Sequence, residues 1–87
     1  MTILIDPPLV LAHGRSWSHL VSDTSYAELH AFAREHGIPE RGFDRDHYDV
    51  PGDYYDRLVE AGARPVSPRD LVSRLVATGL RRRKSQA

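Results

Sequence analysis

The stretch that organises the chain reads HGRSWSHLVSD, from His13 to Asp23. It holds the only tryptophan, two histidines, an arginine, an aspartate and a glycine within eleven positions, a density that core packing alone does not explain. A second polar stretch, FDRDHYD, runs from Phe43 to Asp49. The rest of the chain has the pattern of an ordinary small domain, and we expect this scaffold to bring the two polar stretches together.

The length of 87 residues suits one domain with a modest hydrophobic core. We expect residues 1–80 to form this α/β domain and residues 81–87 to form a disordered basic tail. The tail carries four of the twelve basic residues, so the rest of the chain, with eight basic and twelve acidic residues, is mildly acidic. Because the tail is short and has no interleaved aromatic residues, fraying explains it better than contact with nucleic acid.

The chain contains no cysteine, which excludes disulfides, thiolate metal sites and cysteine nucleophiles. No segment approaches the roughly 20 consecutive apolar residues that a membrane helix requires, and the first residues lack the features of a secretory signal. We therefore expect a cytoplasmic protein with no membrane partner.

Strand and helix signals lie on both sides of the organising stretch. Residues 2–5 are apolar and β-branched, and Asp6-Pro7-Pro8 ends this predicted first strand. Residues 9–12 fit either a strand or a loop, and residues 18–22 have the composition of a strand. Ser25 and Glu28 have capping-box spacing, and apolar residues at helical spacing predict a helix from about Ser25 to His36, ended by Gly37.

The second half of the chain predicts two more helices and a strand. A helix begins at Pro51 or Asp53 and ends at Gly62, residues 63–66 form a strand, and Ser67-Pro68 starts a third helix that ends near Gly79. This order indicates a small layered α/β fold with a short parallel or mixed sheet and three helices. If the strands are parallel, Asp6 and Asp23 lie at the same edge, where ligands bind in such folds.

A divalent metal is one candidate ligand of the polar stretches. Imidazoles and carboxylates suit zinc or manganese without thiolates, although no recognised metal-binding spacing is present. For Asp23, N-capping of the first helix is the alternative to metal binding. The candidate ligands are Asp6, His13, His19, Asp23 and His47.

The sequence His47-Tyr48-Asp49 has three interpretations. If the segment is extended, His47 and Asp49 share one face and Tyr48 lies on the other, which gives two metal ligands or a histidine oriented by a carboxylate for acid–base chemistry. In the third interpretation, Asp49 caps a loop before the second helix. The candidate catalytic residues are His19, His47 and Asp49. The neighbouring Asp44, Arg45 and Asp46 fit surface ion pairs of small energetic value.

Recognition of a phosphate-containing ligand is the other candidate chemistry. An arginine grips phosphate through two hydrogen bonds, and a tryptophan stacks on a base, although a core position is the simpler explanation of the tryptophan here. No phosphate-binding glycine motif is present, and no nucleophile-elbow glycines surround the serines, so a serine hydrolase is disfavoured. The candidate ligand-binding residues are His13, Arg15, Trp17, Arg45 and Tyr48.

Three motifs carry a resemblance to a known family: HGRxWxHLxSD at residues 13–23, ELHxFA at residues 28–33 and HYD at residues 47–49. On these motifs, the sequence resembles the domain-of-unknown-function family 4031, a family of short bacterial and phage proteins. The resemblance runs from Ile3 to about Leu80. It implies a self-contained domain and brings no activity, substrate or cofactor.

The residues therefore predict a small binding domain with a polar site for a nucleotide or nucleic acid. The alternative is a metal-dependent phosphoesterase or nuclease-like hydrolase that uses zinc or manganese. Convergence of three or more of the histidines and aspartates within coordination distance would favour the enzyme. Apolar stripes on all three predicted helices leave both a monomer and a homodimer open.

Overall fold

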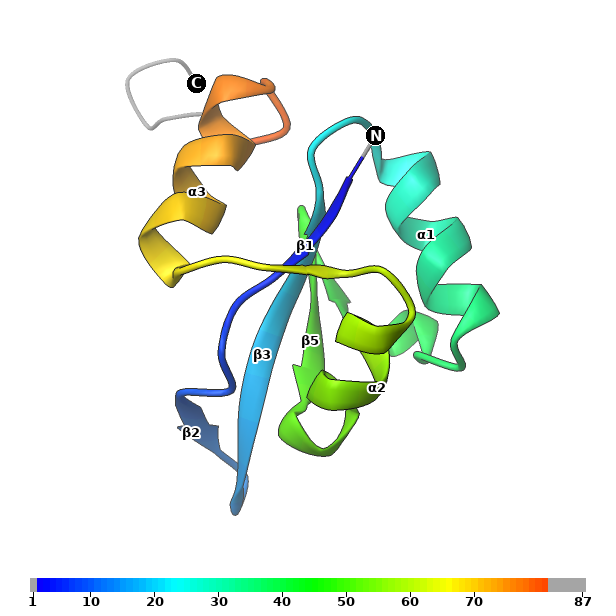
Figure 1. Ribbon diagram of the computed structural model, residues 1–87, viewed down its shortest axis with the longest axis vertical. Helices are drawn as coiled ribbons and strands as arrows, with labels where there is room; N and C mark the ends of the chain where they lie inside the picture. The colour runs from blue at the N-terminus through cyan, green and yellow to red at the C-terminus, as the bar shows by residue number, and fades with distance from the viewer. Residues whose placement is uncertain (1, 82–87) are drawn as a thin grey trace.

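A computed structural model of the chain describes residues 2–81, which form three layers (Figure 1). The elements, in chain order, are β1 (Ile3–Ile5), β2 (Val10–Ala12), β3 (Arg15–Ser22), α1 (Tyr26–Glu35), the 3-10 helix η1 (Glu40–Gly42), β4 (Phe43–Asp44), β5 (His47–Pro51), the 3-10 helix η2 (Gly52–Tyr54), α2 (Tyr55–Glu60), β6 (Arg64–Pro65) and α3 (Pro68–Ala77). The predicted α/β fold with three helices is confirmed.

The sheet is mixed and is built around β3. Its strand order is β4-β5-β3-β1-β6, and β2 pairs separately with β3. Strand β3 is antiparallel to β1, β2 and β5, whereas β1 and β6 are parallel. Since β1 and β3 run in opposite directions, Asp6 and Asp23, which follow them, lie at opposite ends of the sheet. The condition for a shared edge, parallel strands, is therefore not met for these two carboxylates.

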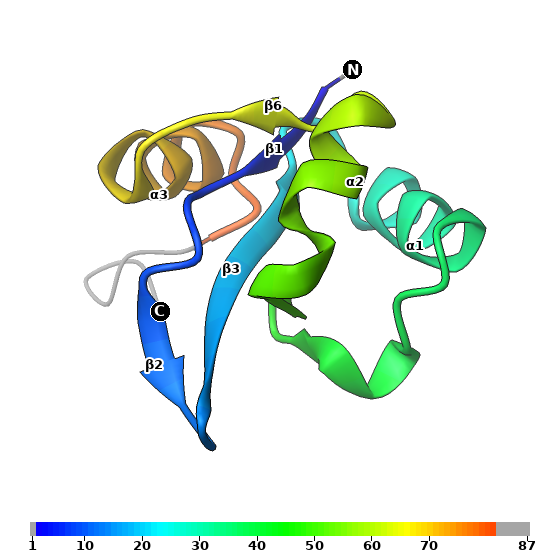
Figure 2. The same ribbon diagram turned by 60° about the horizontal axis from the view of Figure 1, so that its bottom comes forward.

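Each face of the sheet has its own hydrophobic core. On one face, Ile5 of β1 and Leu20 of β3 pack with Leu29 of α1 and Leu58 of α2. On the other face, the core is smaller and joins two sheet residues to two residues of α3, namely Leu4, Val21, Leu71 and Leu75. Figures 1 and 2 show α1 and α2 on one side of the sheet and α3 on the other.

The helix boundaries follow the capping residues of the sequence. Ser25 accepts a hydrogen bond from the backbone N–H of Glu28, and Ser67 accepts one from that of Asp70. Gly37 follows α1 with φ of 74°, a left-handed conformation that glycine adopts without strain. These local signals explain why the first and third helices lie where the sequence predicts them.

The C-terminal end of α3 is tied to the opposite side of the molecule. The Tyr26 hydroxyl donates to the Leu80 carbonyl, and the Arg81 guanidinium bonds Asp46. Arg81 is therefore part of the folded domain, which corrects its assignment to a disordered tail. Residues 82–87, the rest of that predicted tail, lie outside the described residues. Within residues 2–81, no helix is both long enough and apolar enough to cross a membrane.

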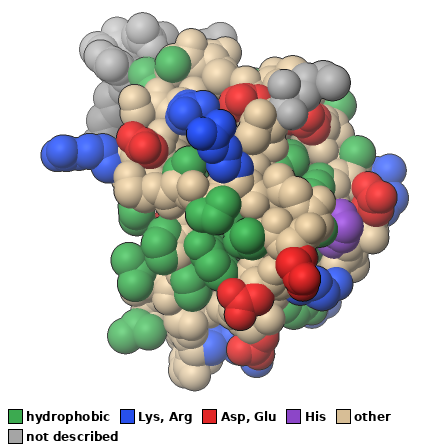
Figure 3. Space-filling model, in the orientation of Figure 1, with side chains coloured by type: hydrophobic (Ala, Val, Ile, Leu, Met, Phe, Trp, Pro, Cys, Tyr) green, Lys and Arg blue, Asp and Glu red, His purple; other side chains and the backbone are tan. Residues whose placement is uncertain are grey.

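One surface beside β2 is apolar. Leu9 and Leu11 are 68% and 83% exposed, and Val10 is exposed beside them. Figure 3 shows hydrophobic side chains gathered over the lower left of the molecule, where Figure 1 places β2. A homodimer would have such a surface available for burial between its subunits, whereas a monomer leaves it exposed. Both oligomeric states stay predictions.

Candidate metal centre

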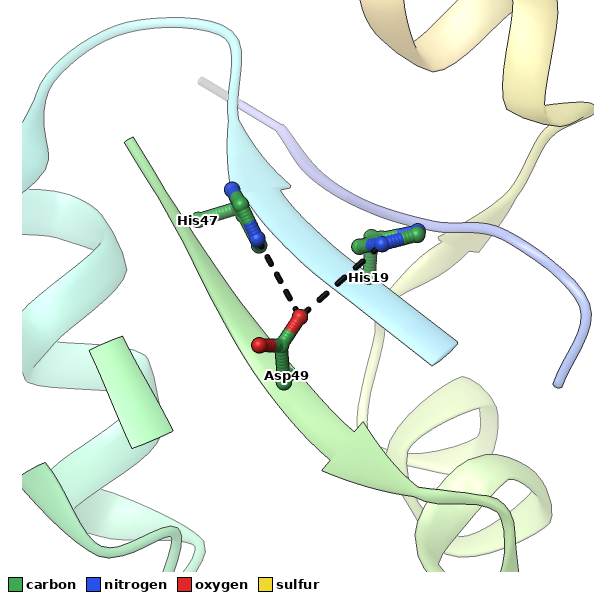
Figure 4. Close-up of side chains that lie close together, drawn as sticks. All are labelled: His19, His47 and Asp49. Atoms are coloured by element: carbon green, nitrogen blue, oxygen red, sulfur yellow. Dashed lines mark hydrogen bonds and ion pairs between the residues drawn. The ribbon is translucent and has the colours of Figure 1, made fainter. Parts of the chain in front are cut away.

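Three side chains from two neighbouring strands converge on one point (Figure 4). His19 lies on β3, and His47 and Asp49 lie on β5; one ligand atom from each lies within 4.8 Å of the other two. The Asp49 Oδ1 atom is 3.1 Å from His47 Nε2 and 3.8 Å from His19 Nε2. The structure therefore brings together all three predicted catalytic residues.

Strand alternation and register create this convergence. In β5, Tyr48 and Val50 are buried, so His47 and Asp49 face the opposite side of the sheet. The β3–β5 register places His19 directly opposite Asp49, where side chains of antiparallel strands are in reach of each other. Helix α3 covers Val21 further along the same face of β3 but leaves the His19 side chain 31% exposed.

His19 is held in place by Asp6, which lies behind it at the end of β1. The Asp6 carboxylate accepts from the His19 backbone N–H at 2.6 Å and lies 2.8 Å from His19 Nδ1. The hydrogen bond to Asp6 raises the pKa of His19 above its usual value, with burial opposing it and the charges of Asp6 and Asp49 adding to it. Asp6 is only 2% exposed, so it orients His19 and does not reach the common point. Asp6, which the sequence predicts as a metal ligand, is instead the hydrogen-bond partner that orients the candidate ligand His19.

His47 has a matching support in Asp46. Its Nδ1 atom is 2.8 Å from Asp46 Oδ1, and Arg81 binds both oxygens of Asp46 at 2.7 and 3.0 Å. Burial alone would raise the pKa of Asp46, but hydrogen bonds from Arg81 and His47 outweigh it and hold that pKa below its usual range. The expectation that Asp46 forms surface ion pairs is wrong, because its carboxylate is buried against residues from a distant part of the chain.

This donor set suits zinc or a similar divalent ion. With Nδ1 of each histidine facing a carboxylate, the two Nε2 atoms are the ones that face Asp49, and metal-binding histidines are usually oriented by such a partner. Three protein ligands leave coordination positions open for water or substrate, as in catalytic zinc sites. The His47 ring lies between two carboxylates, with Nδ1 2.8 Å from Asp46 Oδ1 and Nε2 3.1 Å from Asp49 Oδ1.

His13 and Trp17 lie beside the three ligand residues. They line the same surface hollow, of about 380 Å³. His13 and Gly14, with φ of 52° and 78°, form the two-residue turn between β2 and β3, as expected for a tight hairpin. His13 is thus placed at the rim of the site and is not one of the converging ligands.

Trp17 and Arg15 also line a second, larger cleft of about 590 Å³ that reaches Asp49. The Trp17 indole N–H donates to the Ala12 carbonyl at 2.9 Å, and the ring belongs to neither hydrophobic core. The expectation of a core position for Trp17 is therefore wrong. Arg41, which sequence reasoning did not single out, lines the same cleft.

Three candidate residues lie away from the convergence point. Tyr48 is 2% exposed and faces the core beneath α1 and α2, on the other side of the sheet. Its hydroxyl there is 2.6 Å from His30 Nδ1. Asp23 accepts from the Thr2 backbone N–H at 2.8 Å at the far end of β3. Arg45 occupies the β4–β5 turn with φ of 60° and lines a hollow shared with Leu80 and Arg81.

Sequence reasoning missed the roles of Asp46 and Arg81. Asp46 is adjacent to His47, which is a weak signal, because a histidine ligand often has a carboxylate partner. No local pattern links Arg81 to Asp46, since 35 positions separate them and only the packing of α3 brings them together.

The comparisons with known proteins identify a family and no activity. No curated protein and no solved structure matches the chain. A family model described as "Protein of unknown function (DUF4031)" matches residues 3–78, which include every residue of the candidate centre and Asp6 and Asp46 behind it. The chain therefore belongs to this family of proteins of unknown function.

Proposed function

We propose that this protein is a metal-dependent hydrolase that binds zinc or a similar divalent ion through His19, His47 and Asp49 and cleaves a phosphate ester. The observation that carries the proposal is the pair of oriented histidines. Each has Nδ1 against a buried carboxylate and Nε2 toward Asp49. A purely structural pair of histidines would not require two such supports directed at one half-exposed point.

The three ligand residues leave room for chemistry at the ion. When bound, the ion supplies Lewis acidity and lowers the pKa of a coordinated water toward neutrality. Asp6 and Asp46 keep the two imidazoles in the tautomer that presents Nε2, and Asp49 supplies the negative charge that completes the set. His13, at the rim of the same hollow, is placed to exchange a proton with solvent or substrate.

The adjoining arginines favour a phosphate ester as substrate. Arg15 and Arg41 line the cleft that reaches Asp49, and guanidinium groups suit phosphate oxygens in both charge and geometry. The same arginines support a second candidate function, a non-catalytic domain that binds a phosphate-containing ligand. The two candidates differ in whether an ion at the histidines is required.

Metal binding is the first test. We expect isothermal titration of zinc and manganese into metal-free protein to give about one site per chain and a higher melting temperature that a chelator reverses. His19→Ala and His47→Ala should weaken binding by at least about 100-fold, more than the loss of an orienting partner does. His36→Ala, at the C-terminal end of α1, is the matched control and should bind normally.

Hydrolysis is the second test. Metal-loaded protein should release nitrophenol from bis(4-nitrophenyl) phosphate or from 4-nitrophenyl phosphate, and the two substrates distinguish a diesterase from a monoesterase. His19→Ala should lose this activity while the protein stays folded, at some cost in stability because the buried Asp6 keeps its bond from the backbone N–H of residue 19 but loses the imidazole. A protein that binds no metal and shows no chelator-dependent shift would contradict the metal centre and leave the binding domain. A variant that simply unfolds would show that His19 is structural.

A further inference from the structure

The cleft beside the metal centre has the size of a small-molecule site. Its volume of about 590 Å³ lies within the roughly 300–1,000 Å³ typical of ligand pockets. Asp49 and Trp17 line both this cleft and the hollow that holds the histidines, so the two adjoin at these side chains. A ligand in the cleft would therefore have one end beside Asp49, the residue of the candidate centre that lines it.

The charges in the cleft favour an anion. Arg15 and Arg41 are exposed, and among residues 2–81 neither has a carboxylate oxygen within 4.0 Å of its guanidinium nitrogens. Asp44 and Asp49 also line the cleft and would oppose an anion. The two guanidinium groups and the two carboxylates cancel, and a divalent ion at Asp49 makes the net charge of the cleft positive.

The aromatic side chains favour a flat ring at the other end of the ligand. Trp17, Phe43 and Tyr54 all line the cleft. The Trp17 ring is fixed by its hydrogen bond to the Ala12 carbonyl, and the Arg15 guanidinium carbon lies 5.9 Å from its ring centroid. A half-buried, oriented indole next to an arginine is the combination that binds a base by stacking and a phosphate by charge.

We propose that this cleft binds a nucleoside phosphate, with its phosphate between Arg15, Arg41 and the metal centre and its base against Trp17. This inference rests on the proposed function, since it names the substrate class of the same centre. The cleft carries two arginines that have no carboxylate partner among residues 2–81, which suits a mononucleotide better than a long nucleic acid that needs a continuous basic track.

The single tryptophan makes the test direct, because the intrinsic tryptophan fluorescence comes from Trp17 alone. Adenosine monophosphate and guanosine monophosphate are titrated into protein holding one equivalent of zinc, alongside adenosine, ribose 5-phosphate and inorganic phosphate. We expect saturable quenching by the nucleotides, at least about tenfold tighter than by the nucleoside because of the charged hydrogen bonds. Ribose 5-phosphate and inorganic phosphate should bind without comparable quenching.

Variants then separate the cleft from the metal centre. Arg15→Gln and Arg41→Gln should each weaken nucleotide binding about tenfold while zinc affinity, measured by calorimetry, stays unchanged. Arg64→Gln is the control, because Arg64 is exposed on β6 and does not line the cleft. His19→Ala should lose zinc and also the zinc-dependent part of the nucleotide affinity.

Several outcomes would overturn the inference. Zinc binding without any nucleotide quenching at millimolar concentration would leave the metal centre but remove the nucleotide. Equal quenching by nucleoside and nucleotide, insensitive to both arginine variants, would show that the phosphate is not recognised. Full nucleotide affinity without zinc would separate the cleft from the centre, and much tighter binding of a single-stranded oligonucleotide would contradict a mononucleotide ligand. Failure of zinc binding is seen by calorimetry before any nucleotide is added, so it contradicts the proposed function separately.

Discussion

At the scale of single residues, aspartates of similar appearance in the sequence perform different tasks. Asp49 is 43% exposed at its side chain and faces the two histidines, whereas Asp6 is buried and bonds the Nδ1 side of His19. The difference comes from position in the sheet. Asp49 lies within a strand on the open face, and Asp6 lies just past the end of β1, next to the backbone of His19. Composition alone therefore predicts a carboxylate-rich site without assigning the ligands.

Asp6→Asn should weaken zinc binding about 10- to 100-fold, the usual effect of losing a partner that orients a ligand. The amide oxygen can still accept from the His19 backbone N–H, but the amide nitrogen cannot accept from Nδ1–H, so the preferred tautomer of His19 is lost. Calorimetric titration measures the affinity. Asp23→Asn is the matched control and should bind zinc normally; equal affinities for both variants would contradict the orienting role.

Asp23 should instead affect the pH dependence of stability. The hydrogen bond from the Thr2 backbone N–H is the main cause of its lowered pKa, with a smaller contribution from Thr24. A carboxyl group with a lowered folded-state pKa stabilises the fold above its unfolded value of 3.8 and loses that contribution as the pH falls through the folded value. Because Asp23 is only partly buried, Asp23→Asn should cost less than about 1 kcal/mol at pH 7.

Urea unfolding of the wild type and Asp23→Asn at a series of pH values measures this difference. It should shrink as the pH falls below 3.8, where the wild-type carboxyl becomes protonated. A difference that stayed constant down to that range would show that Asn disturbs the hydrogen bond to Thr2 and not only the charge.

At the scale of elements, local structure was predictable and strand pairing was not. The capping serines at 25 and 67 and the alternation of His47, Tyr48 and Asp49 depend on neighbouring residues, and the structure agrees with them. The approach of His19 to Asp49 depends on the pairing of β3 with β5, which helix α1 and η1 separate in the chain. No local pattern specifies such a register, because contacts between distant segments are fixed by the whole core.

Strand β5 separates the candidate centre on one face from the core on the other. A substitution at Tyr48 should therefore change stability, and one at His47 should change zinc binding. Tyr48→Phe removes the hydroxyl that bonds His30 and should cost about 1 kcal/mol of unfolding free energy while zinc affinity stays unchanged. His47→Gln should remove zinc binding with a smaller effect on the unfolding of metal-free protein. Urea unfolding and calorimetry measure both quantities. A loss of zinc affinity in Tyr48→Phe would show that the two faces are coupled.

At the scale of the whole molecule, the centre is supported from both sides of its strand pair. Asp6 comes from the end of β1, and Arg81 reaches Asp46 from beyond α3, the helix that covers the adjoining part of the same face. The segment after α3 is also held by the hydrogen bond from Tyr26 of α1 to Leu80. The orientation of His47 therefore depends on how the segment after α3 packs against Asp46. The domain boundary predicted at residue 80 excluded Arg81, because no local sequence pattern links Arg81 to Asp46.

Arg81→Ala should reduce both stability and zinc affinity. It leaves the buried Asp46 carboxylate without its bidentate partner, which should cost about 1–3 kcal/mol of unfolding free energy. Zinc affinity should fall less than in Asp6→Asn, because Arg81 acts on His47 only through Asp46. Arg81→Lys should recover part of the stability, since a lysine restores the charge but not the two parallel hydrogen bonds.

A double-mutant cycle with Asp46→Asn tests whether the two residues act together. Asn leaves no unpaired charge behind, so the double variant should lose less stability than the sum of the single variants. Urea unfolding of the four metal-free proteins gives the coupling energy, and calorimetry on the same proteins gives the effect on zinc. Additive losses would mean that Arg81 stabilises α3 independently of Asp46. Coupled stability with unchanged zinc affinity would mean that Asp46 holds the end of the chain in place but does not orient His47.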